Sequence, residues 1–161
     1  MTLDPDFREP HLRRGDFLGA FAVIEWQARI LMVQNERSID GRSVRTWDLP
    51  GGQVEPGELL HEALRRELRE EASLQVVGAP RFLFVQEGSR VAGARRLHAW
   101  RSFFFAVDTA GEPRAAGEVL AVRWFSRREL GDVLTAPYHG SFRDWLAGGG
   151  TFFAAEWRDP R

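Results

Sequence analysis

Cysteine is absent from the 161 residues of the chain. Its absence excludes disulfide bonds and thiolate metal sites, and it agrees with a reducing compartment. A basic excess is also missing, because the formal net charge is −1 and the pI is about 6.4. Duplex nucleic acid is bound by proteins with a strong positive field, so it is not an expected partner. A small molecule is the expected ligand.

Long hydrophobic runs are missing as well. The longest extends from residue 17 to residue 24 and is too short to cross a bilayer. Residues 1–15 are polar, contain proline and lack the apolar core of a secretory signal. These absences indicate a soluble cytoplasmic protein that does not bind membranes. With no internal repeat or linker, we expect a single domain over residues 1–161, in which 1–15 form an N-terminal extension.

An acidic helix is the most informative feature that is present. From Leu59 onwards, the sequence LLHEALRRELREEASL places apolar residues at helical spacing. At about 100° per residue, Glu67, Glu70 and Glu71 are assigned to the arc of the apolar stripe, where ionised carboxylates rarely lie unless they are paired or bind a metal. Three carboxylates on that arc predict a divalent cation beside the helix. A solvated face held by ion pairs is the competing interpretation for the helix taken alone.

The segments that flank this helix favour the metal interpretation. A Gly51-Gly52 pair precedes the helix, and charged residues follow at fixed intervals as far as Leu74. The spacing resembles the signature of the Nudix hydrolase superfamily. It departs from the family pattern at Ser73, where glycine is usual. The positions that match are Gly52, Glu58, Arg66, Glu67, Leu68, Glu70, Glu71 and Leu74.

The resemblance implies a fold, an activity and a cofactor. The implied fold is α/β, a Nudix-type α/β/α sandwich with a mixed β-sheet. The implied activity is Mg²⁺-dependent hydrolysis of the pyrophosphate linkage in a nucleoside diphosphate joined to another group, such as a nucleotide sugar or a nucleoside triphosphate. A Nudix module that binds a nucleotide or metabolite without hydrolysing it is the alternative. No subfamily motif follows the signature, so the identity of the nucleotide stays open.

The parts of the motif have distinct expected roles. Glycine at 51 and 52 permits a sharp turn, so that the main-chain carbonyl of Gly51 can face the same metal as the helix acids. Glu67, Glu70 and Glu71 are expected to converge on that metal, and hard oxygen ligands suit Mg²⁺ or Mn²⁺. Arg66 lies four residues before Glu70 and is expected to pair with it, which would orient its carboxylate.

Three other residues complete the expected site. Glu58 precedes the helix and is expected to brace the loop rather than to bind metal. Hydrolysis requires a carboxylate that accepts a proton, and the resemblance places this role on Glu67 or on the loop residue Glu118. Ser73 occupies the position of a left-handed helix cap, where a residue other than glycine costs about 1 kcal/mol. No ligand oxygen is lost by this replacement.

The remaining pattern predicts strands and two further helices around the motif. Loops are expected at 35–45 and 87–96. Ser126 and Glu129 have the spacing of a capping box that starts a helix ending near residue 134, and a last helix should begin at Ser141 and end at the glycines 148–150. The predicted strands cover residues 17–26, 29–34, 46–49, 81–86, 97–107 and 121–125.

Aromatic residues are concentrated in the C-terminal segment 151–161. We expect them to pack in the core, and a homodimer contact is the second interpretation. A nucleobase could stack on an aromatic side chain, although each candidate is expected first of all to be a core residue. The candidates are Trp47, Trp100, Phe82 and Phe84.

Overall fold

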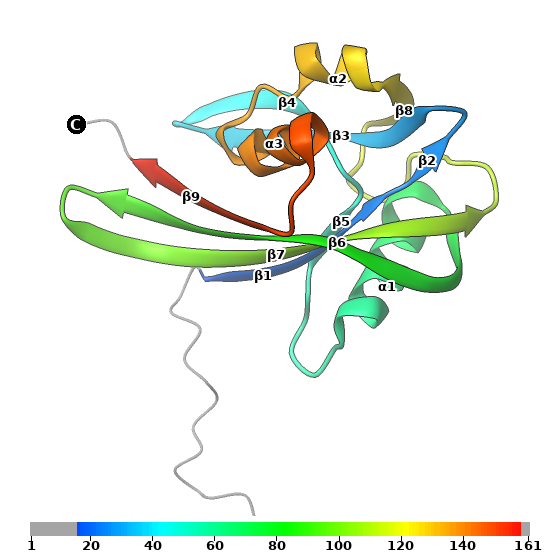
Figure 1. Cartoon of the computed structure of the whole chain (residues 1–161), viewed down its shortest axis with the longest axis horizontal. Coiled ribbons are helices and arrows are strands. Elements are labelled where there is room, and N and C mark those ends of the chain that lie inside the picture. The colour runs from blue at the N-terminus through cyan, green and yellow to red at the C-terminus, as the bar shows by residue number, and fades with distance from the viewer. Residues whose placement is uncertain (1–15, 159–161) are drawn as a thin grey trace, which may run out of the picture.

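The computed structural model describes residues 16–158 (Figure 1). The N-terminal extension expected at 1–15 lies outside the described residues. Strands dominate residues 16–158, and three α-helices interrupt them there. The elements are β1 (Phe17–Val23), β2 (Glu25–Trp26), β3 (Arg29–Ile39), β4 (Arg42–Asp48), β5 (Gly51–Gln53), α1 (Leu60–Ala72), β6 (Gln75–Ala92), β7 (Arg95–Ala110), β8 (Ala121–Ser126), α2 (Arg127–Val133), the 3-10 helix η1 (Pro137–His139), α3 (Gly140–Gly148) and β9 (Phe152–Arg158).

Two β-sheets form the framework. The larger has the strand order β5-β1-β7-β6-β9, and it is mixed because β1 runs parallel to β7 and β9 runs parallel to β6. The smaller contains β2, β3, β4 and β8, all paired antiparallel to a neighbour. This arrangement confirms the expected α/β class with a mixed sheet.

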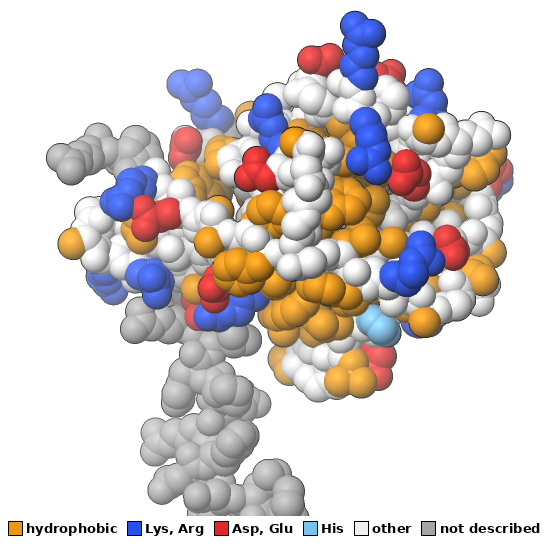
Figure 2. Space-filling model, in the orientation of Figure 1, with side chains coloured by type: hydrophobic (Ala, Val, Ile, Leu, Met, Phe, Trp, Pro, Cys, Tyr) orange, Lys and Arg blue, Asp and Glu red, His pale blue; other side chains and the backbone are white. Residues whose placement is uncertain are grey.

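Hydrophobic side chains fill two core layers on opposite sides of the larger sheet. One layer joins α1 to residues such as Ala20, Ala22 and Phe105. The other joins α2 and α3 to residues such as Phe84 and Phe104. In Figure 1, α1 accordingly lies on one side of the sheet, whereas α2 and α3 lie on the other. Hydrophobic side chains are gathered across the middle of the face that Figure 2 shows, with arginines around its edge.

Helix α1 has the predicted buried stripe, because Ala63, Leu64, Leu68 and Ala72 are all buried. Of the three acids assigned to the same arc, Glu67 is largely covered, with a side chain 14% exposed. Glu70 is not, because its side chain is 55% exposed. The assignment of Glu70 to the buried arc was wrong, since neighbouring residues on a helix point about 100° apart and Glu70 therefore lies at the rim.

Helix α1 ends where the sequence predicted, in a left-handed residue. Ser73 has φ 58° and ψ 29°, and its N–H donates to the carbonyl of Arg69. The next N–H, that of Leu74, donates to the carbonyl of Leu68, which completes the usual double closure of a helix C-terminus. The Ser73 hydroxyl donates to the carbonyl of Arg114 at 3.3 Å, so the serine gains one contact that glycine could not make.

Two segments expected to be loops are instead strand hairpins. Residues 35–45 form the ends of β3 and β4, which turn at Asp40 and Gly41, both with positive φ. Residues 87–96 likewise belong to the long β6–β7 hairpin, which turns at Gly93. Both hairpin ends are polar, so they lack the alternation of apolar residues from which strands are recognised.

The C-terminal segment forms a strand. β9 pairs with β6, and the ring of Phe153 packs edge-on against Phe84 with centroids 5.4 Å apart. The core interpretation is thus confirmed for Phe153 but not for Phe152, which is 60% exposed, and the homodimer contact stays a prediction. The capping box before α2 is also confirmed, because Ser126 and Glu129 bond to each other's backbone N–H.

Replacement of Ser73 tests the left-handed cap. Ser73→Ala keeps the backbone strain and loses the hydroxyl contact, whereas Ser73→Gly relieves strain of about 1 kcal/mol. We expect the glycine variant to melt about 2–4 °C above the alanine variant in calorimetry. Equal melting temperatures, or a more stable alanine variant, would contradict the cap geometry.

Candidate active site

Two glycines bring the backbone up against helix α1. Gly51 has φ 140°, and a Cβ there would collide with the carbonyl oxygen of Ala20. At Gly52, a Cβ would lie 2.7 Å from the Oε1 atom of Glu67. Side chains at these positions would therefore displace either β1 or the Glu67 carboxylate, so the turn requires glycine for close approach as well as for conformation.

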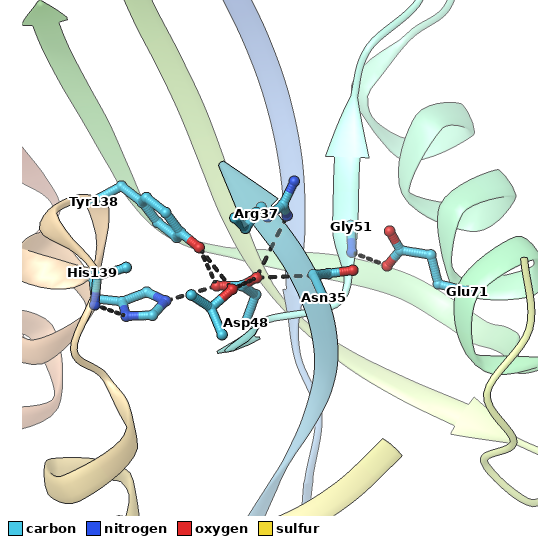
Figure 3. Close-up of polar contacts among 9 residues, drawn as sticks. Asn35, Arg37, Asp48, Gly51, Glu71, Tyr138 and His139 are labelled. Atoms are coloured by element: carbon cyan, nitrogen blue, oxygen red, sulfur yellow. Dashed lines mark hydrogen bonds and ion pairs between the residues drawn. The ribbon is translucent and has the colours of Figure 1, made fainter. Parts of the chain in front are cut away.

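The Gly51 backbone contacts the second covered acid of the helix. Its N–H donates to the Oε2 atom of Glu71 at 3.0 Å (Figure 3). The sequence predicted instead that the Gly51 carbonyl would face a metal shared with the helix acids. The structure brings Gly51 and Glu71 together as expected, but through the N–H, and the role of the carbonyl stays a prediction.

Arg66 connects the loop before the helix to the helix acids. Its guanidinium bonds to both carboxylate oxygens of Glu58 at 2.8 and 2.9 Å and to the carbonyl of Gln53. It also contacts Glu67 at 2.9 Å and Glu70 at 3.2 Å. The expected Arg66–Glu70 pair and the bracing role of Glu58 are both present. The Arg66 guanidinium lowers the pKa of Glu58 to about 2, so Glu58 remains an anion that holds the arginine in place.

The two covered acids of the helix titrate in the opposite direction. Burial raises the pKa of Glu67, although Arg66 opposes the rise. Burial also raises the pKa of Glu71, to about 7, against the hydrogen bond from Gly51, and the charge of Glu67 adds to the rise. A pair of covered carboxylates that repel each other holds excess negative charge, which a cation would neutralise.

The donor set fits a hard divalent cation, because Glu67 and Glu71 supply carboxylate oxygens. The three acids do not converge in this structure, since between residues 16 and 158 no three His, Asp or Glu side chains form a group that could hold a metal, and the role of Glu70 as a third ligand stays a prediction. The physical reason is that Arg66 holds both Glu67 and Glu70, and Glu70 lies at the exposed rim.

A cavity of about 290 Å³ is lined by residues such as Phe21 and Phe104, which belong to the core layer on the face of the larger sheet opposite helix α1. Of the four stacking candidates predicted from the sequence, only Trp100 lines it. Phe84 is fully buried and Phe82 is exposed on the surface, while Trp47 packs against Phe125. The cavity, here called the aromatic cavity, has walls formed mainly by Phe17, Phe21, Trp100, Phe104, Phe142 and Trp157.

A buried carboxylate, Asp48, lines the aromatic cavity, and Figure 3 shows the side chains that contact it. It lies three residues before Gly51 and is only 5% exposed. Burial alone would raise the pKa of Asp48, but the hydrogen bonds that it accepts outweigh burial and lower its pKa to about 2. The groups that contact it come from Asn35, Arg37, Thr46, Tyr138 and His139.

The hydrogen bonds around His139 define its tautomer. Nδ1 accepts the backbone N–H of Ala136 at 3.0 Å, so it carries no proton. Nε2, 2.7 Å from Asp48, must then be the protonated nitrogen and the donor. Sequence reasoning missed this cluster because its members lie as far as 91 positions from Asp48 and match no local motif.

Comparison with known proteins identifies the family. A family model described as the NUDIX domain matches residues 16–146. The chain belongs to the NUDIX family. The mutator MutT protein from Bacillus halodurans has the same fold, with a TM-score of 0.72 at 19% identity over 88% of this chain and 90% of that one.

Sequence relatives of this Nudix chain carry the names of nucleotide hydrolases. A Mycobacterium tuberculosis protein, whose name provisionally assigns it 8-oxo-dGTP diphosphatase activity, is 37% identical over 63% of this chain and 66% of its own length. Human 8-oxo-dGDP phosphatase NUDT18 is 33% identical over 68% of this chain and 32% of its own length. The chain thus spans less than two thirds of these curated relatives.

The last residue predicted for the Nudix site, Glu118, is exposed in the loop between β7 and β8. That loop is anchored on the C-terminal turn of α1, where the N–H of Ala116 donates to the carbonyl of Glu71 at 3.0 Å. The loop therefore lies beside the helix that carries the acids, and the role of Glu118 stays a prediction.

Within residues 16–158, no helix is long and apolar enough to span a membrane.

Replacement of Asp48 tests the buried cluster. We expect Asp48→Asn to lower the free energy of unfolding by about 2–4 kcal/mol, because several donors lose their anion. Tyr138→Phe, the control, removes one donor and should cost about 1 kcal/mol. Urea denaturation measures the free energy of unfolding of both variants and of the wild type.

The free energy of unfolding should depend on pH in the wild type and lose part of that dependence in Asp48→Asn. Because the pKa of Asp48 falls from 3.8 to about 2 on folding, its stabilisation is complete above pH 3.8 and is lost as the pH drops towards 2. This acid-dependent loss should disappear in Asp48→Asn. If the free energy of unfolding of Asp48→Asn fell with acid as steeply as that of the wild type, the Asp48 carboxylate would not be held as an anion.

Proposed function

We propose that this Nudix chain is a divalent-cation-dependent nucleotide pyrophosphohydrolase that acts on nucleoside triphosphates. The observation that carries the proposal is the pair of covered carboxylates, Glu67 and Glu71, with raised pKa values beside the Gly51-Gly52 turn. The names of the relatives favour a nucleoside triphosphate over a nucleotide sugar.

The positions of the aromatic cavity and the helix acids suggest how the nucleotide lies. The aromatic cavity suits a flat nucleobase, which would stack between apolar rings. The phosphates would then extend past Arg37, which lines the cavity and contacts Asp48 at 3.5 Å. The charge of Arg37 also lowers the pKa of Glu71, so this arginine is near enough to interact with the helix acids as well as with Asp48. Its guanidinium suits a phosphate.

The acids of α1 have the predicted roles in this proposal. Glu67 and Glu71 supply carboxylate oxygens for Mg²⁺ or Mn²⁺, with Glu70 and the Gly51 carbonyl as the further ligands. When bound, such a cation lowers the pKa of a water molecule and neutralises phosphate charge. Arg66 is the positioning residue, because it holds Glu67 and Glu70 while Glu58 anchors it.

Either Glu67 or Glu118 accepts the proton of the attacking water. The raised pKa of Glu67 suits a general base, but Arg66 engages one of its oxygens. Glu118 is exposed and lies in a loop held against α1. The pH–rate profile of Glu118→Gln separates the two. Near-normal turnover at every pH excludes Glu118 as the general base. If the fall in rate at low pH disappears in this variant, Glu67 is excluded as the general base.

Charge-neutral replacements of the helix acids test the proposal. With Mg²⁺ saturating, we expect Glu70→Gln and Glu71→Gln each to lower turnover by more than tenfold, because each removes a ligand charge. Glu62→Gln, on the exposed face of the same helix, is the matched control and should retain normal turnover. Product chromatography on a panel of nucleoside triphosphates measures the rates. Normal turnover in both variants would contradict the ligand assignment, and no hydrolysis of any nucleotide by the wild type would favour a binding module.

Cation binding should depend on pH. Glu71 has a pKa of about 7 without a cation, and its proton must leave before an oxygen binds metal. Mn²⁺ affinity, measured by calorimetry, should therefore fall by up to about tenfold per pH unit below 7 and level off above it. Glu71→Gln should flatten this dependence. A wild-type affinity that is constant from pH 5.5 to 8 would contradict a role for Glu71.

A further inference from the structure

Two neutral polar side chains form part of the floor of the aromatic cavity. Gln86 on β6 and Ser102 on β7 are direct partners in the strand register, so their side chains lie next to each other on one face of the sheet. Both line the cavity. Gln86 is 4% exposed and Ser102 is 5% exposed, so the sheet and the cavity walls cover almost all of both residues.

Neither side chain is held by the protein. Among the interactions of residues 16–158, no hydrogen bond involves the Gln86 amide or the Ser102 hydroxyl. A covered amide without a partner destabilises a fold, because it loses its hydrogen bonds to water. No buried side-chain nitrogen or oxygen within the described residues is both unpaired and sealed from solvent. The unpaired polar atoms of Gln86 and Ser102 must therefore face the cavity that these residues line.

The surrounding sheet leaves room for a flat ligand over this pair. Two residues away on each strand, Gly88 of β6 lies opposite Trp100 of β7. A Cβ at Gly88 would collide with the indole ring. The ring can therefore lie against the sheet and serve as a wall of the cavity. On the other side of the pair, Phe104 stacks on Phe84 with centroids 4.2 Å apart. The polar pair is thus bounded by aromatic rings along the strand direction.

We infer that Gln86 and Ser102 determine base recognition by bonding to the buried edge of the nucleobase. The inference rests on the proposed function, because it takes the ligand of the aromatic cavity to be a nucleotide. Neither side chain is charged, and both can donate and accept hydrogen bonds. They match the mixed donor and acceptor edge of a base, whereas the positive charge that suits a phosphate is supplied at the cavity by Arg37.

The freedom of the Gln86 amide extends the inference to the class of substrate. A half-turn of an unrestrained amide exchanges its NH₂ donor and its carbonyl acceptor, and a free hydroxyl rotates in the same way. Guanine and its 8-oxo form differ at one edge, where the ring nitrogen N7 changes from acceptor to donor and C8 gains a carbonyl oxygen. Gln86 can therefore bond to either form, so this chain accepts oxidised and unmodified purine nucleotides with similar affinity.

Binding of nucleoside monophosphates without a divalent cation tests the inference apart from hydrolysis. We expect calorimetry to give dissociation constants for dGMP and 8-oxo-dGMP that agree within about tenfold. Gln86→Leu should weaken binding of both by about tenfold, since one hydrogen bond contributes about that factor. Ser102→Ala should weaken both several-fold. Glu87→Gln is the matched control, because Glu87 pairs with Arg101 on the surface, and its affinities should equal those of the wild type.

Melting temperature separates a binding role from a structural role. Gln86→Leu removes an amide that bonds to no protein group and reaches the solvent of the cavity, so we expect its melting temperature to lie within about 2 °C of the wild type while it binds more weakly. Wild-type affinity in Gln86→Leu, a wild-type preference above about tenfold for one purine, or a melting temperature of Gln86→Leu more than about 2 °C below the wild type would each overturn the inference. Tight binding of both monophosphates by a protein without hydrolase activity would refute the proposed function and leave the inference standing.

Discussion

The close approach of the Gly51-Gly52 turn to helix α1 is the contact on which the rest of the site depends. The turn cannot move outwards, because β5 pairs with β1. The helix cannot move away either, since its apolar stripe is buried against the same sheet. The carboxylates of Glu67 and Glu71 are therefore confined between backbone and helix, where burial raises their pKa values. Packing concentrates negative charge there, and Arg66, which contacts Glu67 at 2.9 Å, offsets only part of it.

Asp48 and Glu71 show how differently the fold treats two covered carboxylates on either side of one short strand. Asp48 accepts hydrogen bonds from several side chains, and its pKa falls to about 2. Glu71 receives one backbone N–H, and its pKa rises to about 7. A fully bonded anion stabilises the cluster that ends the aromatic cavity. An incompletely bonded one retains the capacity to bind a cation or a proton, which is typical of functional sites.

The sequence predicted the features that depend on nearby residues. The extent of α1, the left-handed Ser73, the capping box at Ser126 and the Arg66–Glu70 pair all follow from spacings of a few positions, and the structure contains each of them. The position of Glu70 was misjudged because a helical stripe has a rim, where a small angular error changes a residue from covered to exposed. The polar hairpins were missed because their strands extend beyond the core and need no apolar alternation.

The aromatic cavity and the Asp48 cluster could not have been predicted in the same way. Their residues lie on strands and helices far apart in the sequence, and no local spacing relates Asp48 to His139 or Gln86 to Ser102. Only the strand register brings them together. Individually, Gln86 and Ser102 are unremarkable polar residues in a strand. Their significance comes from burial without a hydrogen-bond partner, which is a property of the folded chain.

Anomalous diffraction from crystals soaked in Mn²⁺ would test the central claim most directly. The account predicts an anomalous peak bounded by carboxylate oxygens of Glu67 and Glu71, next to the Gly51-Gly52 turn. It would be contradicted by a map with no peak at this position, in which Glu71 kept only its hydrogen bond to Gly51.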